Sequence, residues 1–367
     1  MKRIRHLLGI SGGKDSAALA IYMKDKYPQL DIEYYTCDTG KELDETYQLI
    51  TNLEIFLGKK IIRLKAFEGS PEDPFDHKLK SLTGFLPSQQ FRWCTKSLKL
   101  DPFEKFVGAD NVISYVGIRG DEERDGYISR KPNIQTIFPF RKNIWSEDVI
   151  VRLLSNNNSE QVLHLYSNIK PSKSSARFKE VLQQPVSLKF NQVQKLNLLL
   201  DINIKDFNAL VFSFLKTTNY PLSNEEGFAL TDNDDILIRD DIFRILEESG
   251  VGVPKYYKKI DFEVNGKKGQ YSRSRSGCYF CFFQQKIEWI WLFEQHPDKF
   301  KLALEYEKEG YTWNQNEKLA DLVKPERMQQ IKEDYLIRVE KNSQSKSPYL
   351  LDILNEAEEE GCAACFI

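Results

Sequence analysis

The sequence predicts an α/β protein built on a parallel sheet with helices on both faces. Short apolar runs alternate with longer amphipathic runs over residues 6–64, a pattern typical of β-α-β units. A polar loop with two glycines separates the first apolar run from the first amphipathic run. A loop of this kind between a strand and a helix is typical of phosphate-binding folds.

Each predicted element rests on its own apolar or amphipathic run, and the helix that starts at 145–148 also has a capping-type start. The elements are, in chain order, a strand at 6–10, a helix at 15–27, a strand at 32–37, a helix at 44–56, a strand at 61–64, a helix at 94–106, a strand at 111–117 and a helix that starts at 145–148 and ends at 154. Because crossover helices separate the strands, we expect parallel pairing.

The composition changes after residue 154. Residues 156–159 are polar, and from there to about residue 251 helical patterns alternate with loops that carry neither cysteine nor a glycine-rich stretch. We therefore expect three parts: a nucleotide-binding core at 1–154, a mostly helical insertion at 155–250, and a cysteine-bearing segment with a helical C-terminus at 251–367.

Charge and hydropathy exclude several classes of protein. The 52 Lys and Arg residues and 54 Asp and Glu residues give a net charge of −2, so a global excess of positive charge does not drive nucleic-acid binding. No apolar run approaches the roughly 18 residues that a membrane span needs. The first residues lead into a polar loop rather than a signal sequence. We expect a cytoplasmic protein with no membrane partner.

Cysteine is the residue type that points to chemistry. Six cysteines are too few for a disulfide framework in a chain of 367 residues, and a clustered set in a reducing compartment indicates a metal or catalytic site. Only four histidines are present, and none forms an HExxH pair. A histidine-ligated zinc hydrolase is therefore not expected.

The glycine loop runs from Ser11 through Gly12, Gly13, Lys14 and Asp15 to Ser16. Its two glycines let a phosphate approach the backbone, and the following helix presents N–H groups and a positive dipole end. Lys14 adds a cation, and Ser11 and Ser16 add hydroxyl donors. Asp15 follows the lysine where a Walker A loop has Ser or Thr, so this is a different phosphate loop.

This loop resembles the pyrophosphate-binding loop (PP-loop) of the adenine nucleotide α-hydrolase, or ATP pyrophosphatase, superfamily. The resemblance implies that the loop grips the pyrophosphate portion of ATP and that cleavage falls between the α and β phosphates. Four further segments are similar to motifs of the phosphoadenosine phosphosulfate reductase branch: Asp38-Thr39-Gly40 with Glu45-Thr46, Arg92 to Lys96, Gly117 to Arg124, and Pro139 to Val149.

The nucleotide site implied by these motifs extends beyond the PP-loop. Asp38, Thr39 and Gly40 follow the second strand, at the sheet edge where open α/β folds bind ligands. Arg119 follows a later strand and can make charge-assisted hydrogen bonds to phosphate or sulfate. Either charged residue could instead belong to an ordinary salt bridge.

The cysteines suggest a metal or redox centre. Cys278 and Cys281 form a C-x-x-C turn, and Cys94 lies in the motif at 92–96. Reductases of the related branch hold a [4Fe-4S] cluster with cysteines at these two places, which implies Cys94, Cys278 and Cys281 as ligands. The fourth ligand is either Cys362 or Cys365, or one iron is open to an exogenous sulfide. Zinc and inert cysteines are the alternatives.

A basic segment precedes the C-x-x-C turn, with Tyr256, Tyr257 and Tyr271 interleaved. Cations for phosphates and aromatic faces for bases suit a nucleic-acid groove, although a solvated charged surface gives the same pattern. The residues predicted to bind nucleic acid are Lys258, Lys259, Lys267, Lys268, Arg273 and Arg275.

Together these observations favour ATP-dependent sulfur insertion into nucleic acid, DNA rather than RNA, most similar to the sulfur-transfer enzyme of bacterial DNA phosphorothioation systems. Lys14, Ser11, Ser16 and Arg119 are the expected catalytic residues, with ATP, Mg²⁺ and a [4Fe-4S] cluster as cofactors. Expected partners are a cysteine desulfurase or other sulfur donor and other subunits of a modification or defence system. The alternatives are a phosphoadenosine phosphosulfate or adenylylsulfate reductase, and a catalytically silent nucleotide sensor with a structural zinc.

Overall fold

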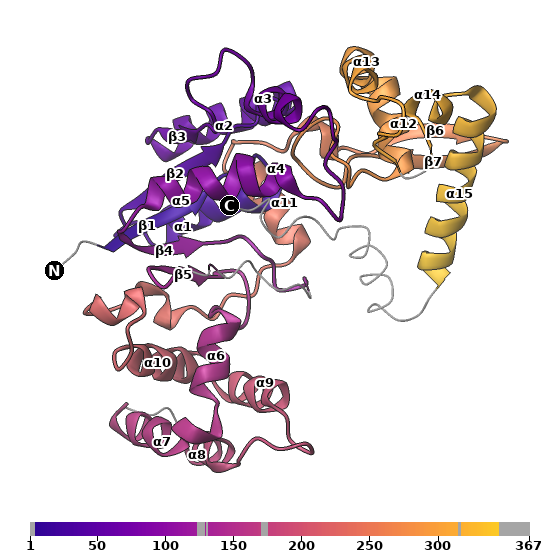
Figure 1. Ribbon diagram of the computed structural model, residues 1–367. Helices are drawn as coiled ribbons and strands as arrows, with labels where there is room; N and C mark the ends of the chain where they lie inside the picture. Colours follow the sequence, from indigo (N-terminus) through magenta and orange to yellow (C-terminus); the bar gives the residue numbers. More distant parts are fainter. Residues whose placement is uncertain (1–3, 123–128, 130, 170–174, 315–316, 345–367) are drawn as a thin grey trace.

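The structure is a computed structural model that describes residues 4–122, 129, 131–169, 175–314 and 317–344 (Figure 1). Its centre is a five-stranded parallel sheet with the strand order β3-β2-β1-β4-β5. The strands are β1 (Ile4–Gly9), β2 (Ile32–Cys37), β3 (Ile61–Leu64), β4 (Asn111–Tyr115) and β5 (Ile134–Ile137). The predicted α/β class is confirmed. Because the strand order reverses between β1 and β4, ligands are expected beyond the carboxyl ends of those two strands.

Helices cover both faces of the sheet. On one face α1 (Lys14–Lys26) and α2 (Asp44–Leu57) pack against Leu8 of β1 and its neighbours, in the largest hydrophobic core. On the other face α5 (Asp101–Val107) packs against Leu7, the adjacent β1 residue, in a smaller core. Successive strand residues point to opposite faces, so a single strand anchors both helical layers.

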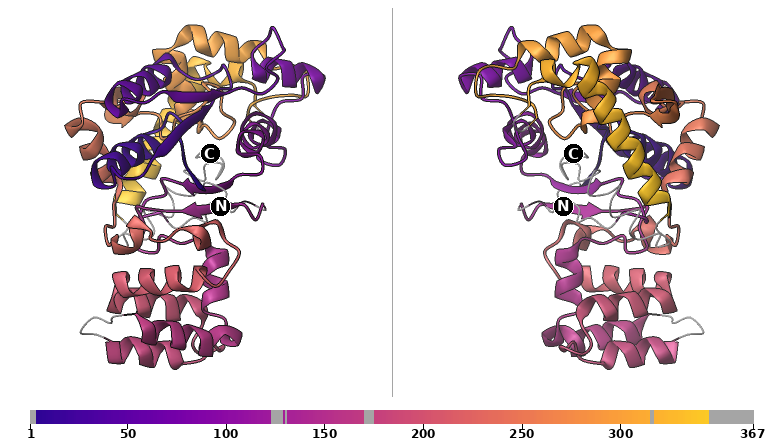
Figure 2. Two further views of the ribbon diagram at one scale, coloured as in Figure 1. Left: turned by 90° about the vertical axis from the view of Figure 1, so that its left-hand side faces the viewer. Right: turned by 90° about the vertical axis from the view of Figure 1, so that its right-hand side faces the viewer.

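The middle of the chain forms a helical lobe beside β5 (Figure 2). Its helices are α6 (Glu147–Leu153), α7 (Ser159–Asn168), α8 (Ser175–Gln183), α9 (Gln192–Ile202), α10 (Ile204–Leu215) and α11 (Arg239–Glu248), with short 3₁₀ turns at η2 (Asn156–Asn158), η3 (Pro221–Asn224) and η4 (Ala229–Asp232). The last of them, α11, lies apart from the other helices of the lobe and packs against α1 of the sheet domain (Figure 1). The hydrophobic core of the helical lobe is continuous with that of the sheet.

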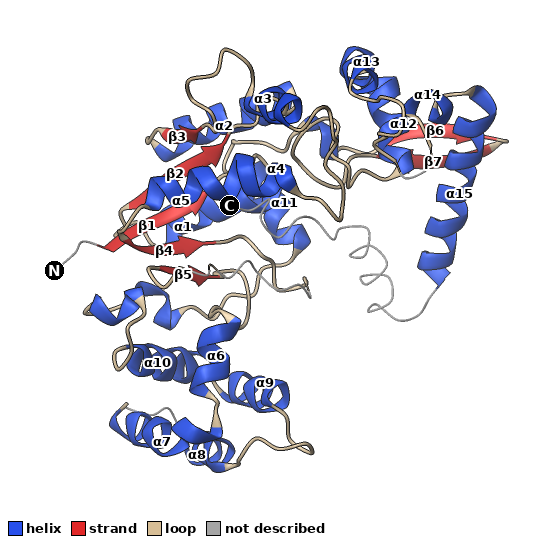
Figure 3. Cartoon of the chain, viewed as in Figure 1, coloured by secondary structure: helices blue, strands red, loops and turns tan. Residues whose placement is uncertain are grey.

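The C-terminal part forms a second lobe with its own core (Figures 1 and 3). It contains η5 (Lys255–Tyr257), the hairpin of β6 (Ile260–Val264) and β7 (Lys267–Tyr271), and the helices α12 (Lys286–Gln295), α13 (Pro297–Glu305), α14 (Leu319–Leu322) and α15 (Pro325–Gln344). α3 (Pro74–Ser81) packs into this core through Phe75. None of the helices in the described ranges has the length and apolarity needed to cross a bilayer.

Candidate nucleotide and cysteine site

The PP-loop lies at the switch point of the sheet, between the end of β1 and the start of α1. Gly12 has a φ of 75°, and a Cβ there would lie 2.2 Å from Cγ2 of Thr46, a residue of the predicted motif. A Cβ on Gly13 would lie 2.6 Å from the hydroxyl of Ser276. Gly12 is therefore required by its positive φ and by close packing, whereas Gly13 has an ordinary φ of −94° and is restricted only by its packing against Ser276.

Hydrogen bonds within the loop hold its shape. The hydroxyl of Ser16 accepts from the backbone N–H of Ser11 at 3.1 Å, and the hydroxyl of Ser11 accepts from the N–H of Gly13 at 3.3 Å. The two hydroxyls also lie 3.1 Å apart. Ser11 lines the pocket next to the loop, whereas the side chain of Ser16 supports the loop from behind.

Two tyrosines from the C-terminal part close over the loop. Tyr256 donates from its hydroxyl to the carbonyl of Gly12 at 2.9 Å. The Oη of Tyr257 accepts from the backbone N–H of Lys14 at 3.3 Å, and the ammonium of Lys14 lies 5.1 Å from the centre of the Tyr257 ring. In the sequence, these rings are predicted to be stacking surfaces for bases. The structure instead uses both to position the PP-loop.

A buried ionic cluster lies next to the loop. Asp15 accepts from Nη1 of Arg119 at 3.0 Å, and its other oxygen lies 3.3 Å from the ammonium of Lys14. Burial alone would raise the pKa of Asp15, but the charges of Lys14 and Arg119 outweigh it and lower that pKa below its ordinary value. The carboxylate is therefore ionised at neutral pH and holds both cations at the loop.

Arg119 reaches this cluster from the loop after β4. It also contacts Asp121 at 2.8 Å and Glu122 at 2.8 Å. A Cβ on Gly117, in the same motif, would lie 2.9 Å from the carbonyl oxygen of Asp15, so this glycine lets the two loops touch. Arg119 lines the pocket while it is held by three carboxylates. Arg119 can therefore both belong to this salt-bridge cluster and contact a phosphate or sulfate in the pocket.

The loop after β2 forms the next wall. Asp38 accepts from the N–H of Gly40 at 2.9 Å and from the hydroxyl of Tyr47 at 3.0 Å, so this carboxylate shapes the loop. A Cβ on Gly40 would lie 2.7 Å from the carboxylate of Asp73. Thr39 is the member of the predicted set 38–40 that lines the pocket.

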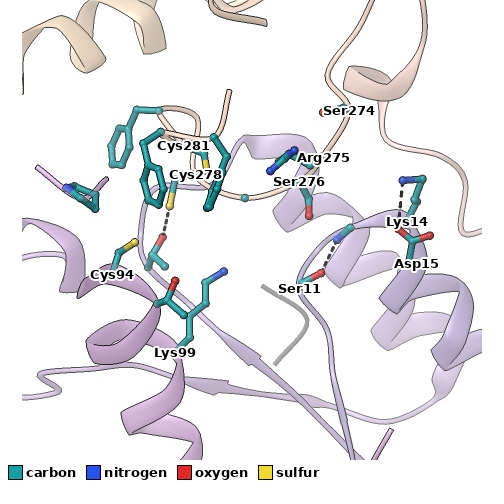
Figure 4. Close-up of a pocket in the computed structure, with 18 of the residues that line it drawn as sticks. Ser11, Lys14, Asp15, Cys94, Lys99, Ser274, Arg275, Ser276, Cys278 and Cys281 are labelled. Carbon is teal, nitrogen blue, oxygen red and sulfur yellow. Dashed lines mark hydrogen bonds and ion pairs between the residues drawn. The ribbon is translucent and has the colours of Figure 1, made fainter. Parts of the chain in front are cut away.

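One pocket joins the PP-loop to the cysteines (Figure 4). Ser11, Lys14 and Asp15 form one end, and Cys94, Cys278 and Cys281 line the same cavity. Figure 4 shows Cys278 and Cys281 on the loop that faces Cys94 across the pocket. Residues that lie far apart in the sequence, and that were predicted separately, thus share one cavity.

The cysteines are free thiols in this arrangement. The sulfur of Cys278 lies 3.2 Å from Oγ1 of Thr39, whose hydroxyl donates to Glu42 at 2.7 Å. Burial, reinforced by the carboxylate of Glu42, raises the pKa of Cys278 well above its ordinary value. Cys37 lies at the end of β2, and burial raises its pKa to about 12, so this thiol is a poor nucleophile at neutral pH.

The predicted [4Fe-4S] cluster needs ligands that converge on one point. Within the described ranges, no group of three or more His, Cys, Asp or Glu side chains is placed to hold a metal ion. The three cysteines share a cavity without forming such a group, so the cluster stays a prediction. Positions 123 and 124 of the motif at 117–124, and the cysteines Cys362 and Cys365, lie outside the described residues.

Lys99 is a pocket residue that the sequence pattern does not reveal. Cys94 belongs to α4 (Trp93–Thr95), and the π-helical turn η1 (Lys96–Leu100) follows directly. Residues five positions apart lie about 140° from each other around an α-helix, whereas the wider π turn brings them closer to the same side of the helix. Lys99 therefore lines the same pocket as Cys94. Burial raises the pKa of Glu42 above its ordinary value, and the charge of Lys99 opposes part of that rise.

The predicted basic surface is not one surface. Lys267 and Lys268 are exposed on the β6–β7 hairpin, where Lys267 lies 3.7 Å from Glu340 of α15. Arg273 is only 1% exposed and donates to the carbonyl of Cys278 at 3.2 Å, so the prediction that it contacts nucleic acid is wrong. Arg275 lines the pocket. Lys258 and Lys259 are exposed after η5.

The fold and the loop define a nucleotide-binding α/β protein. Residues 5–169 match the phosphoadenosine phosphosulfate reductase domain, which places this part of the chain in the PP-loop ATP pyrophosphatase superfamily. An uncharacterized protein of Methanocaldococcus jannaschii is 33% identical over 153 residues, which cover 38% of this chain and 30% of that relative. The chain thus matches less than a third of that relative's length. No solved structure matches the chain.

Proposed function

We propose that the protein uses ATP to activate a phosphate group of DNA and then inserts sulfur at that phosphate. The observation that carries the proposal is the shared pocket: the loop that suits a pyrophosphate and three cysteines line one cavity. An enzyme that activates a substrate with ATP and then transfers sulfur to it needs phosphate-binding groups and cysteines within reach of that substrate.

The first step is adenylation. An oxygen of the DNA phosphate attacks the α-phosphorus of ATP, the bond to the bridging oxygen breaks, and pyrophosphate leaves. Lys14 and the N–H groups at the start of α1 stabilise the charge that develops on the leaving group. Mg²⁺, expected from the chemistry of nucleotide phosphates, neutralises part of that charge when it is bound.

The second step transfers sulfur. A persulfide on one cysteine of the C-x-x-C pair, supplied by a cysteine desulfurase or other persulfide donor, attacks the activated phosphorus and displaces AMP. The thiolate of the second cysteine attacks the first cysteine's sulfur, which releases the phosphorothioate and leaves a Cys278–Cys281 disulfide. An external thiol reductant restores the pair.

Turnover of ATP under anaerobic conditions tests this proposal. We expect pyrophosphate and AMP rather than orthophosphate and ADP, with release stimulated by DNA, and phosphorothioate in the DNA when a persulfide donor is present. Sulfite formed from phosphoadenosine phosphosulfate or adenylylsulfate would identify a reductase instead. Nucleotide binding with no turnover and with bound zinc would identify a silent sensor.

A further inference from the structure

A wide groove lies beside the candidate pocket. Its walls are the loop at 85–92, the segment 282–287 that leads into α12, the turn at 310–314, and one side of α15. Pro87, Phe282, Phe283 and Trp313 line both the groove and the pocket. The groove therefore opens onto the cavity that holds the cysteines and the PP-loop.

Aromatic rings are exposed along this groove. Phe91 is 59% exposed and Tyr311 is 37% exposed, and each contacts the ring of Phe85 edge-on, with centroids 5.6 and 5.5 Å apart. Edge-on contact with one central ring leaves the outer rings accessible. Large apolar groups held at a polar surface indicate a binding site for a ligand with flat faces.

The groove also carries positive charge. Its lining includes four cationic side chains, Arg92, Lys286, Arg327 and Arg338, and one carboxylate, Asp334. Arg327 and Lys286 both pair with Glu317, so the balance is four cations against two carboxylates. The guanidinium of Arg92 lies 4.9 Å from the centre of the Phe283 ring, at the junction with the pocket.

We propose that this groove binds single-stranded DNA and directs its backbone into the pocket, an inference that rests on the proposed function. Cations along a groove follow a phosphate backbone, and exposed rings stack on bases that are not stacked on each other. A duplex keeps its bases stacked, so Phe91 and Tyr311 would find no partner there. The aromatic rings therefore favour a single strand.

A protein partner fits this groove less well. The centres of protein interfaces are depleted in charged residues, whereas cations lie throughout this lining.

The β6–β7 hairpin is a weaker candidate for binding a single strand. Lys267 and Lys268 supply positive charge there without exposed rings, since Tyr271 of the same hairpin is buried. The groove combines both features that a single strand requires and adjoins the reacting groups.

Binding of a fluorescent single-stranded DNA oligonucleotide, without ATP, tests the proposal. We expect the variant Phe91→Ala/Tyr311→Ala to bind at least ~10-fold more weakly, because stacking on an aromatic ring contributes substantially for each base. Arg338→Gln should weaken binding and reduce the dependence of affinity on salt. Phe67→Ala is the matched control, since Phe67 is also 37% exposed but lies outside the groove.

The outcomes separate this inference from the proposed function. Unchanged binding by the double variant, loss of binding in Lys267→Ala/Lys268→Ala instead, or equal binding of a duplex would overturn the groove assignment. Tighter binding of RNA of the same sequence, or no binding of either nucleic acid by the wild type, would overturn it as well. Failure of the wild type to release pyrophosphate, with groove-dependent DNA binding intact, would refute the reaction and leave the groove supported.

Discussion

The Oη of Tyr257 accepts a hydrogen bond from the backbone N–H of Lys14 at 3.3 Å. This N–H lies at the start of α1, among the groups that would otherwise point to a phosphate. The hydroxyl thus occupies a donor of the PP-loop from a segment far along the chain. The C-terminal part completes the nucleotide site and also brings the C-x-x-C turn to it.

Removal of that hydroxyl tests whether it stands in for a phosphate oxygen. We predict that Tyr257→Phe binds ATP at least as tightly as the wild type, because the N–H of Lys14 becomes available to the nucleotide. The free energy of unfolding should fall by about 1 kcal/mol through the lost hydrogen bond. Calorimetric titration and thermal melting measure both effects. A tenfold loss of ATP affinity would show that the hydroxyl contacts the nucleotide directly.

Lys14 is predicted to act on the leaving group rather than on the fold. Lys14→Ala should lower pyrophosphate release roughly 10²–10³-fold, the range found when one stabilising donor is removed from an active site. Lys60→Ala is the control, because the Lys60 side chain is 90% exposed and does not line the pocket. Normal ATP cleavage by Lys14→Ala, measured in the pyrophosphate assay, would refute the loop assignment.

The stability of the C-terminal lobe should depend on pH through Glu317. The hydrogen bond from Arg327 lowers the pKa of Glu317 to about 2, against the smaller opposing effect of burial. A carboxylate with a depressed pKa stabilises the fold above its ordinary value of 4.5, and this contribution is lost as the pH falls toward 2. Melting temperatures between pH 7 and 2 should therefore decrease less for Glu317→Gln than for the wild type or for the exposed control Glu309→Gln.

Much of the nucleotide domain could be predicted from the sequence, because its strands are apolar and short loops separate them from amphipathic helices. The strands at 32–37 and 61–64 have the predicted bounds. β5 was missed because Ile134–Ile137 is a four-residue strand with two polar residues at the edge of the sheet. β3 has the same length at the opposite edge but three apolar residues, whereas the two polar residues of β5 leave too little hydrophobic pattern to recognise.

The β6–β7 hairpin had a signal that the charge pattern obscured. Ile260–Val264 alternates apolar and charged residues and leads into Asn265-Gly266, which takes φ values of 49° and 73°, as a tight hairpin turn requires. The lysines of this segment favour the interpretation as a basic patch instead. The pocket lysine Lys99 was missed for a different reason, since a helical period does not reveal a π turn.

The predicted cluster is tested by iron content. If Cys94, Cys278 and Cys281 hold a [4Fe-4S] cluster, each single substitution by serine should lose bound iron, because a cluster with so few thiolates cannot spare one. Cys37→Ala should keep its iron, since Cys37 does not line the pocket. Full iron in any of the three serine variants of protein purified anaerobically would remove that residue from the ligand set. Deletion of residues 361–367 should lower the iron content if Cys362 or Cys365 is the fourth ligand.

Cys278→Ser separates activation of the substrate from sulfur transfer. Serine keeps a polar atom next to Thr39, which lies 3.2 Å from the sulfur, and the backbone carbonyl that accepts from Arg273 is unchanged. The PP-loop is held by its own serines and by Tyr256, so pyrophosphate release should persist. Phosphorothioate formation should stop, because the pair Cys278–Cys281 can no longer form the disulfide that releases sulfur. Both products are measured in one anaerobic reaction, with Cys37→Ala as the control. Continued phosphorothioate formation by Cys278→Ser would exclude this pair from sulfur transfer.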